Sequence, residues 1–264
     1  MKIDAYIPKE LLSPFILTYL IIESQDEAVN KVLPDTSLVL AFRYKGRLSY
    51  VADNKETSLP FATVSGLRKT MRLFNYSKDT GNILVLFKEA GAAAFFKNPL
   101  HELYDETVSL ENFISQHSVS IIEKQLAEAR DNTQRIVLID KFLLSIMSGQ
   151  KPDILILAAL KKIHLAHGII NIKNLADSLF ISQDPFEKRF RRVVGTSPKQ
   201  FSSLVRMKYI TGTTIQEQNL VDLAFDAGYF DQPHFNKGFK SFTGQTPKDF
   251  FNSPSFLQIN DFIQ

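Results

Sequence analysis

The spacing of apolar residues divides the chain into a β-rich half and a helical half. Over the first hundred residues, short apolar or alternating runs stand between turn formers such as Lys45-Gly46 and Asp79-Thr80-Gly81, a pattern typical of strands. The predicted strands cover 37–42, 48–51, 67–74 and 82–87. From Ser109 onward the apolar period becomes helical. The chain is therefore predicted to be α+β, with a small β barrel or sandwich first and helices after it.

Two helical stripes follow the predicted strands. The first holds Ile122, Leu126 and Ala129, and the second holds Ile136, Ile139, Leu143 and Met147. This spacing predicts a helical hairpin over about 108–148. The stripes either cover the sheet or include a contact that forms a homodimer, and the pattern leaves both open. Ser148 to Pro152 breaks both periods, which divides the chain into domains 1–150 and 151–264.

The stretch from Leu223 to Phe251 predicts a helix-turn-helix. Small residues at 223, 224 and 227 allow a close helix crossing, and Gly228 suits the positive φ at a helix end. Asp231 can cap the next helix, with Pro233 in its first turn. The buried stripe of that helix is Phe235, Phe239 and Phe242. Amides pair with adenine, and cations pair with guanine or phosphate. The candidate DNA contacts on this helix are therefore Gln232, His234, Asn236, Lys237 and Lys240.

The same frame occurs earlier in the chain. Leu175 precedes Leu223 by 48 residues, whereas Phe186 precedes Phe235 by 49, so the extra residue must lie in the turn. Both copies end alike, in GTSP from Gly195 and in GQTP from Gly244. A second copy is much stronger evidence than a single motif. A connecting helix over 197–210 is predicted between them, with Arg206 tying the two halves together.

Two such motifs in tandem resemble the AraC/XylS family of bacterial transcription regulators, over roughly Ile154 to Phe251. The second copy follows the family pattern A-x-x-x-G-Y-x-D-Q-x-H-F-x-K-x-F-K-x-x-x-G-x-T-P, with Lys237 where arginine is usual. The first copy, L-A-x-x-L-x-I-S-x-x-x-F-x-K-x-F-R-x-x-x-G-x-S-P, is also close. The resemblance implies an all-α domain that binds double-stranded DNA, and RNA polymerase as a partner if the protein is an activator.

The first recognition helix has two possible starts, at Ser182 or at Asp184. Asp184-Pro185-Phe186-Glu187 has the form of a capping box, so Glu187 is expected to cap the helix rather than to read cytosine, although both roles stay open. Lys188 and Arg191 are the better candidates for base contacts, whereas Arg189 and Arg192 lie further round and are expected to reach phosphate.

The segment 83–105 resembles the amino-terminal domain of one AraC subgroup, which implies that residues 1–150 sense a small molecule or pair subunits. Nothing in the sequence names a ligand or a cofactor. His101 and His117 make no close pair, so no metal site is expected. Arg43, Arg68 and Arg72 could meet an anionic ligand, but surface positions explain them equally well.

Charge and composition favour DNA over other partners. Residues 1–150 carry 17 Lys and Arg against 18 Asp and Glu, and residues 151–264 carry 14 against 10. Within the second half, 182–208 has a local charge of +5, which suits phosphate; a solvated helix face is the other explanation. The apolar run 11–22 is too broken for a membrane span, and a cytoplasmic location is expected.

Other functions compete with a ligand-controlled regulator. The chain has no cysteine, so it lacks the acceptor that relatives coupled to DNA alkyl repair need, and no G-x-S-x-G marks a serine hydrolase. An enzyme is therefore not expected. The alternative is a constitutive DNA-binding protein without an effector. Its DNA affinity would not change when small molecules are added.

Overall fold

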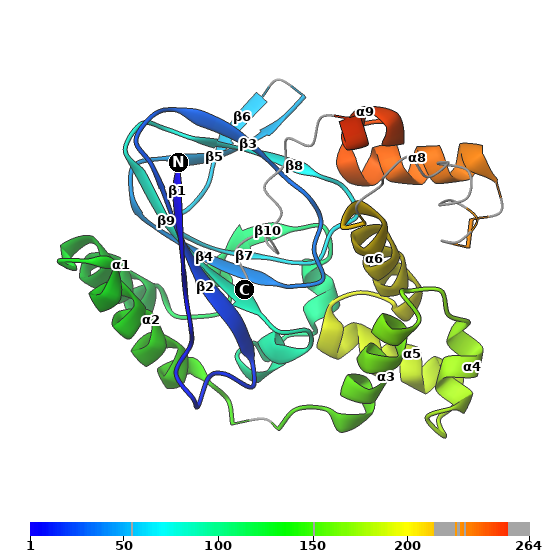
Figure 1. The fold of residues 1–264 in the computed structure, drawn as a ribbon. Helices are drawn as coiled ribbons and strands as arrows, with labels where there is room; N and C mark the ends of the chain where they lie inside the picture. Colours follow the sequence, from blue (N-terminus) through cyan, green and yellow to red (C-terminus); the bar gives the residue numbers. More distant parts are fainter. Residues whose placement is uncertain (54, 150, 214–224, 226–227, 230, 253–264) are drawn as a thin grey trace.

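The computed structural model describes residues 1–53, 55–149, 151–213, 225, 228–229 and 231–252. Two β-sheets form one side of the molecule, and the helices of the second half gather on the other (Figure 1). The strands are β1 (Lys2–Tyr6), β2 (Ile16–Ser24), β3 (Ala28–Val32), β4 (Val39–Lys45), β5 (Leu48–Ala52), β6 (Lys55–Ser58), β7 (Ala62–Ser65), β8 (Arg72–Tyr76), β9 (Thr80–Phe87) and β10 (Thr107–Ser109). The predicted α+β class, with a β-rich domain before a helical one, is confirmed.

The two sheets are antiparallel and face each other. The larger has the order β1-β2-β9-β4-β7-β10, and the smaller has the order β3-β8-β5-β6. Side chains alternate across the larger sheet, as its period of two requires. In β2, for example, Tyr19 and Ile21 belong to the main core, whereas Leu20 and Ile22 line a cavity. This alternation gives the amino-terminal domain an interior of its own.

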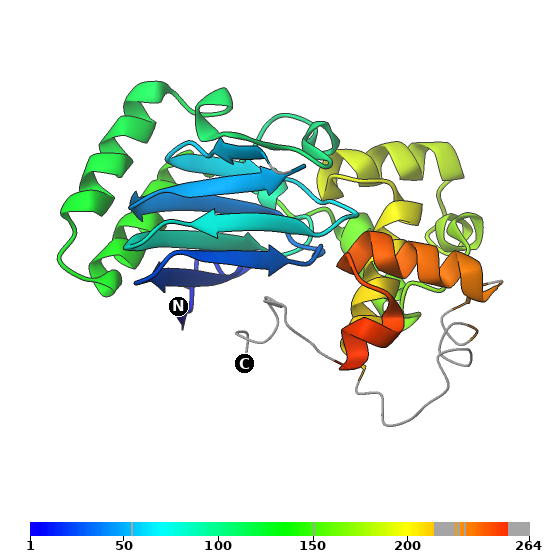
Figure 2. The same ribbon diagram turned by 90° about the horizontal axis from the view of Figure 1, so that it is seen from above.

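The predicted helical hairpin is confirmed as α1 (Gln116–Glu128) and α2 (Asn132–Ile146), and it lies against the larger sheet. Ser115 and Asp131 cap the two helices through their side chains. The hydroxyl of Tyr19 donates a 2.7 Å hydrogen bond to Asp140 inside this contact. The hairpin covers the sheet on the flank opposite the other helices (Figures 1 and 2). Its use as a dimer contact stays a prediction.

The predicted strand over 67–74 is wrong at its start. The chain leaves the larger sheet after β7 and enters the smaller one only at β8. The connecting residues are held by other groups: the amide of Asp105 donates to the carbonyl of Leu67, and the guanidinium of Arg68 donates to the carbonyls of Val32 and Leu33. The apolar run over 67–74 therefore includes the segment that crosses from the larger sheet to the smaller one. Of the broken apolar run over 11–22, residues 16–22 form most of β2.

Three short 3-10 helices and the remaining α-helices complete the described chain. They are η1 (Gly91–Ala94), η2 (Leu100–Leu103), η3 (Leu110–Asn112), α3 (Ile154–Leu165), α4 (Ile172–Asp177), α5 (Gln183–Val194), α6 (Pro198–Thr211), α8 (Gln232–Thr243) and α9 (Pro247–Asn252). One continuous set of buried apolar side chains joins the larger sheet, the hairpin and these helices. Within the described ranges, no helix combines the length and apolarity that a membrane span requires.

Candidate nucleic-acid interface

The two predicted recognition helices, α5 and α8, are built alike at their carboxyl-terminal ends. Asp231 caps α8, because its carboxylate accepts from the amide of His234 at 2.8 Å, and Pro233 lies in the first turn. Gly195 ends α5 with φ 96°, and Gly244 ends α8 with φ 78°. These left-handed positions favour glycine, which has no Cβ to clash with the backbone. The caps predicted from the sequence are thus confirmed at Asp231, Gly195 and Gly244.

Aromatic side chains fix both helices to the core. Phe186 and Phe190 of α5 are fully buried, and Phe190 meets Phe201 of α6 edge to face at 5.7 Å. In α8, Phe235 and Phe239 are buried in the same way. Residues i and i+4 share one face of a helix, so the opposite faces of α5 and α8 are left for polar residues. The helix predicted over 223–227 lies, apart from Phe225, outside the described residues.

The outer face of α8 carries every candidate that the sequence named on it. Gln232, His234, Asn236, Lys237 and Lys240 are exposed. The ring of His234 lies 5.5 Å from the ring of Tyr229, on the side of α8 that faces α6. Asn236 and Lys237 lie further round the helix. This surface combines two amides with two ammonium groups, which is a set of groups that can reach base edges and phosphates.

The structure corrects the expected capping role of Glu187 on α5. The helix begins at Gln183 after Ser182, so Asp184 is not its N-cap. The Glu187 carboxylate accepts a hydrogen bond from the side-chain amide of Gln183 at 2.9 Å and another from the guanidinium of Arg191 at 3.3 Å. Because these partners lie four residues away on either side, Glu187 stabilises the surface of the helix instead of its first turn.

The four basic candidates on α5 differ in their contacts. Lys188, Arg189, Arg191 and Arg192 are all exposed. Arg189 binds both carboxylate oxygens of Asp153, at 2.6 and 2.9 Å, which ties α5 to the N-cap of α3. Arg191 pairs with Glu187 within the helix. Lys188 and Arg192 line a cleft beside the amino-terminal domain. The sequence therefore identified the basic surface, but it did not separate the paired cations from the others.

Arg206 joins the two motifs, as the sequence predicted. Its guanidinium donates to the carbonyl of Gly168, beside the first motif, at 3.0 Å. It also lies 5.5 Å from the centre of the Tyr229 ring, beside the second motif. The helix α6 that carries Arg206 has a complete capping box at Ser197 and Gln200. Helix α6 thus contacts residues of both motifs.

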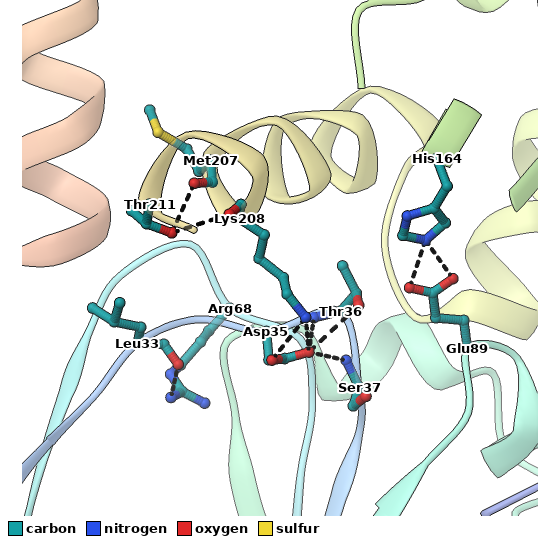
Figure 3. A network of polar contacts seen from close by, with 10 residues as sticks. All are labelled: Leu33, Asp35, Thr36, Ser37, Arg68, Glu89, His164, Met207, Lys208 and Thr211. Carbon is teal, nitrogen blue, oxygen red and sulfur yellow. Dashed lines mark hydrogen bonds and ion pairs between the residues drawn. The ribbon is translucent and has the colours of Figure 1, made fainter. Parts of the chain in front are cut away.

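Contacts between the two halves of the chain were not predicted. Lys208 of α6 binds Asp35 of the amino-terminal domain at 2.9 and 3.0 Å, and His164 of α3 lies 2.8 Å from both oxygens of Glu89 (Figure 3). The short helices η1 and η2 also pack against α5. The first recognition helix is therefore held directly against the β-rich domain.

A small cavity of about 90 Å³ lies between the two sheets. Its lining is mainly apolar, and Arg68 is the cation that borders it. Burial lowers the pKa of Arg68 to about 10, because low polarity disfavours its charged form. Its guanidinium donates to the carbonyl of Leu33, next to the loop that holds Asp35 (Figure 3). Within the described residues, no group of three or more His, Cys, Asp or Glu side chains could hold a metal ion.

Comparisons with known proteins identify two domain families in the chain. Residues 175–253 match the family model of a helix-turn-helix domain, and residues 4–109 match a domain of unknown function (DUF6597). No curated protein matches the chain. Among solved structures, ToxT from Vibrio cholerae bound to an unsaturated fatty acid is 14% identical, with 88% of this chain and 94% of that chain covered and a TM-score of 0.42. The AraC-like transcriptional activator CuxR is 15% identical, with 75% and 83% covered and a TM-score of 0.27.

The tandem frame, the two anchored helices and the family match lead to one assignment. The helix-turn-helix match covers the second half of α4, all of α5 and all of the described second motif. Helix-turn-helix domains bind DNA by placing their second helix in the major groove. The chain is a DNA-binding transcription regulator, and its residues 175–253 belong to a family of helix-turn-helix domains.

Proposed function

We propose that this regulator reads one asymmetric DNA site through α5 and α8. The observation that carries the proposal is the repeated arrangement in which buried phenylalanines anchor a helix whose outer face bears polar and basic side chains. An α-helix of this kind fits the major groove. Because α6 contacts both motifs, we expect the two helices to enter successive major grooves about 34 Å, or about 10 base pairs, apart.

The two helices would read different sequences, since their outward residues differ. On α5, we assign base contacts to Lys188 and Arg191, and phosphate contacts to Arg189 and Arg192. Arg189 and Arg191 would have to exchange their present carboxylate partners for DNA. On α8, the base contacts would come from Gln232, Asn236 and Lys237. His234 and Lys240 would lie at the edges of this DNA-contacting surface. The preferred site would then consist of two unlike segments.

The domain over residues 1–150 would control this activity by sensing a small molecule or by pairing two subunits. The cavity between the sheets supports the sensing role. A guanidinium buried beside apolar groups is costly unless an anion balances its charge, and Arg68 makes no salt bridge to a carboxylate within the described part of the chain. A small carboxylate with a short apolar tail would fit both the size and the charge of this cavity.

A selection from random DNA duplexes with the full-length protein tests the function. The expected product is a set of sites with two unlike conserved segments about one helical turn apart. The selection is then repeated with short aliphatic carboxylates, which should change the amount of DNA retained but not its sequence. Recovery of unenriched DNA would contradict sequence-specific binding. Identical retention with every carboxylate would leave a constitutive DNA-binding protein instead.

A further inference from the structure

A cleft of about 690 Å³ lies where the amino-terminal domain, the linker and the first recognition helix meet. Phe15, Phe96 and Leu157 contribute apolar surface to it. Five basic side chains also line this basic cleft: Lys97, Lys151, Lys188, Arg189 and Arg192. They come from three separate parts of the chain, so only the folded arrangement brings them together.

Most of this positive charge is not balanced within the protein. Of the two acidic residues that line the cleft, Asp153 binds Arg189 and Glu89 contacts His164. No salt bridge among the described residues includes Lys97, Lys151, Lys188 or Arg192. Like charges gathered around one cleft repel each other, and the repulsion is relieved when a polyanion binds.

The cleft lies beside the exposed basic face of α5. Each residue turns an α-helix by about 100°, so Lys188 projects about 200° away from the buried Phe186. Arg192, one turn later, projects in a similar direction. Both residues line the basic cleft. A duplex that receives α5 in its major groove must place one phosphate strand along this side of the helix.

The backbone around Lys97 is held in position by the packing of the amino-terminal domain. It lies between η1 and η2, and both of these short helices pack against α5. A side-chain carbon added at Gly195, the residue that ends α5, would lie 3.3 Å from the carbonyl oxygen of Leu100 in η2. Such a close approach leaves little freedom between η2 and α5, so the backbone that carries Lys97 stays beside α5.

We propose that Lys97 and Lys151 bind backbone phosphates next to the segment that α5 reads. The amino-terminal domain and the linker would thereby form part of the DNA interface. This inference rests on the proposed function, because it requires α5 to enter DNA. Phosphate contacts carry no sequence information. An effector that shifts the domain away from α5 therefore lowers affinity for all sequences while base preference stays the same.

The test compares the salt dependence of DNA binding for three full-length proteins. Fluorescence anisotropy is measured with a duplex from the selection and with a scrambled duplex, over a series of salt concentrations. The double variant Lys97→Ala and Lys151→Ala is compared with wild type and with the matched control Lys78→Ala and Lys141→Ala. Both control lysines are exposed, do not line the cleft and give the same change in net charge.

Each phosphate contact contributes about 0.9 to the slope of log affinity against log salt, so the cleft variant should lose about 1.8 units on both duplexes. The control should keep the wild-type slope. Equal slopes for the cleft variant and the control, with salt-dependent binding by wild type, would overturn the inference but leave the proposed function standing. Absence of salt-dependent binding by wild type would overturn both.

A second arm separates DNA phosphate from a free phosphate compound. Wild type and the cleft variant are titrated with pyrophosphate at constant ionic strength, and thermal stability is recorded. The proposal expects pyrophosphate to bind weakly and the DNA slope to depend on Lys97 and Lys151. Tight pyrophosphate binding that the double substitution abolishes, together with an unchanged DNA slope, would contradict the proposal and assign the cleft to a small anion.

Discussion

The ion pair between Lys208 and Asp35 holds the two halves of the chain together, and the substitution Lys208→Met should loosen this contact. The ammonium nitrogen lies 2.9 and 3.0 Å from the two carboxylate oxygens. The side chains of Lys208 and Asp35 are 23% and 13% exposed, respectively. Methionine retains much of the apolar stem of lysine and removes its charge, so the change is mainly electrostatic.

The magnitude lies between two limits. Exposed ion pairs contribute about 0.2–1 kcal/mol, whereas breaking a buried pair costs about 3–5 kcal/mol. The Lys208–Asp35 pair is partly buried, but Asp35 would keep the backbone amides of Thr36 and Ser37, which donate to it at 2.6 and 3.2 Å. We therefore expect a loss of about 1.4 kcal/mol of docking free energy, and the undocked fraction should rise about tenfold.

Hydrogen–deuterium exchange measures the undocked fraction at the surfaces that it exposes. In Lys208→Met, the amides of η2 and of the last turn of α5 should exchange about tenfold faster than in wild type, while those of β2 and β9 should not change. Lys161→Met is the control, because Lys161 borders the same region without a salt bridge among the described residues. Equal exchange in the variant and in this control would refute the reasoning.

Three further substitutions test separate parts of the structure. Tyr19→Phe should lower the unfolding free energy by about 1.5–3 kcal/mol in chemical denaturation, because Asp140 would lose its buried hydrogen-bond donor. Burial also raises the pKa of Tyr19 in the folded protein. Wild-type stability should therefore fall as pH rises above about 10, where Tyr19 ionises in the unfolded chain but not in the folded one. Glu187→Ala should strengthen DNA binding several-fold in a low-salt titration by releasing Arg191, and unchanged affinity would argue against that release. Phe180→Gly should keep or raise the melting temperature, since the exposed Phe180 has φ 56°.

Local chemistry explains why much of the helix-turn-helix was predictable. Asp231 caps a helix through an amide three residues away, and Gly195 and Gly244 take the left-handed conformation that ends a helix. Such contacts depend on neighbouring residues, so their spacing is visible in the sequence. The same holds for the phenylalanine stripes. Glu187 shows the limit of prediction from local spacing. Its carboxylate could either cap the start of the helix or pair with Arg191, and the spacing fits both.

Long-range contacts were not predictable in this way. Lys208 and Asp35 are 173 residues apart, and no local pattern connects them. The start of the predicted strand over 67–74 was wrong for a similar reason: Arg68 binds carbonyls from residues 32 and 33, which lie on another strand and its following loop. The basic cleft also combines residues from three segments. The individual candidates on α5 and α8 could thus be named, whereas their distant partners required the fold.

The central claim is that α5 and α8 each read their own segment of one DNA site. The most direct test measures the affinities of wild type, Lys188→Ala and Lys237→Ala for the selected duplex and for each of its single base-pair substitutions. Each variant should lose about 1–3 kcal/mol of binding free energy and should relax preference at one or two base pairs. The relaxed positions should lie in different segments for the two variants. A uniform loss across all duplexes, or relaxation in the same segment for both, would contradict tandem reading.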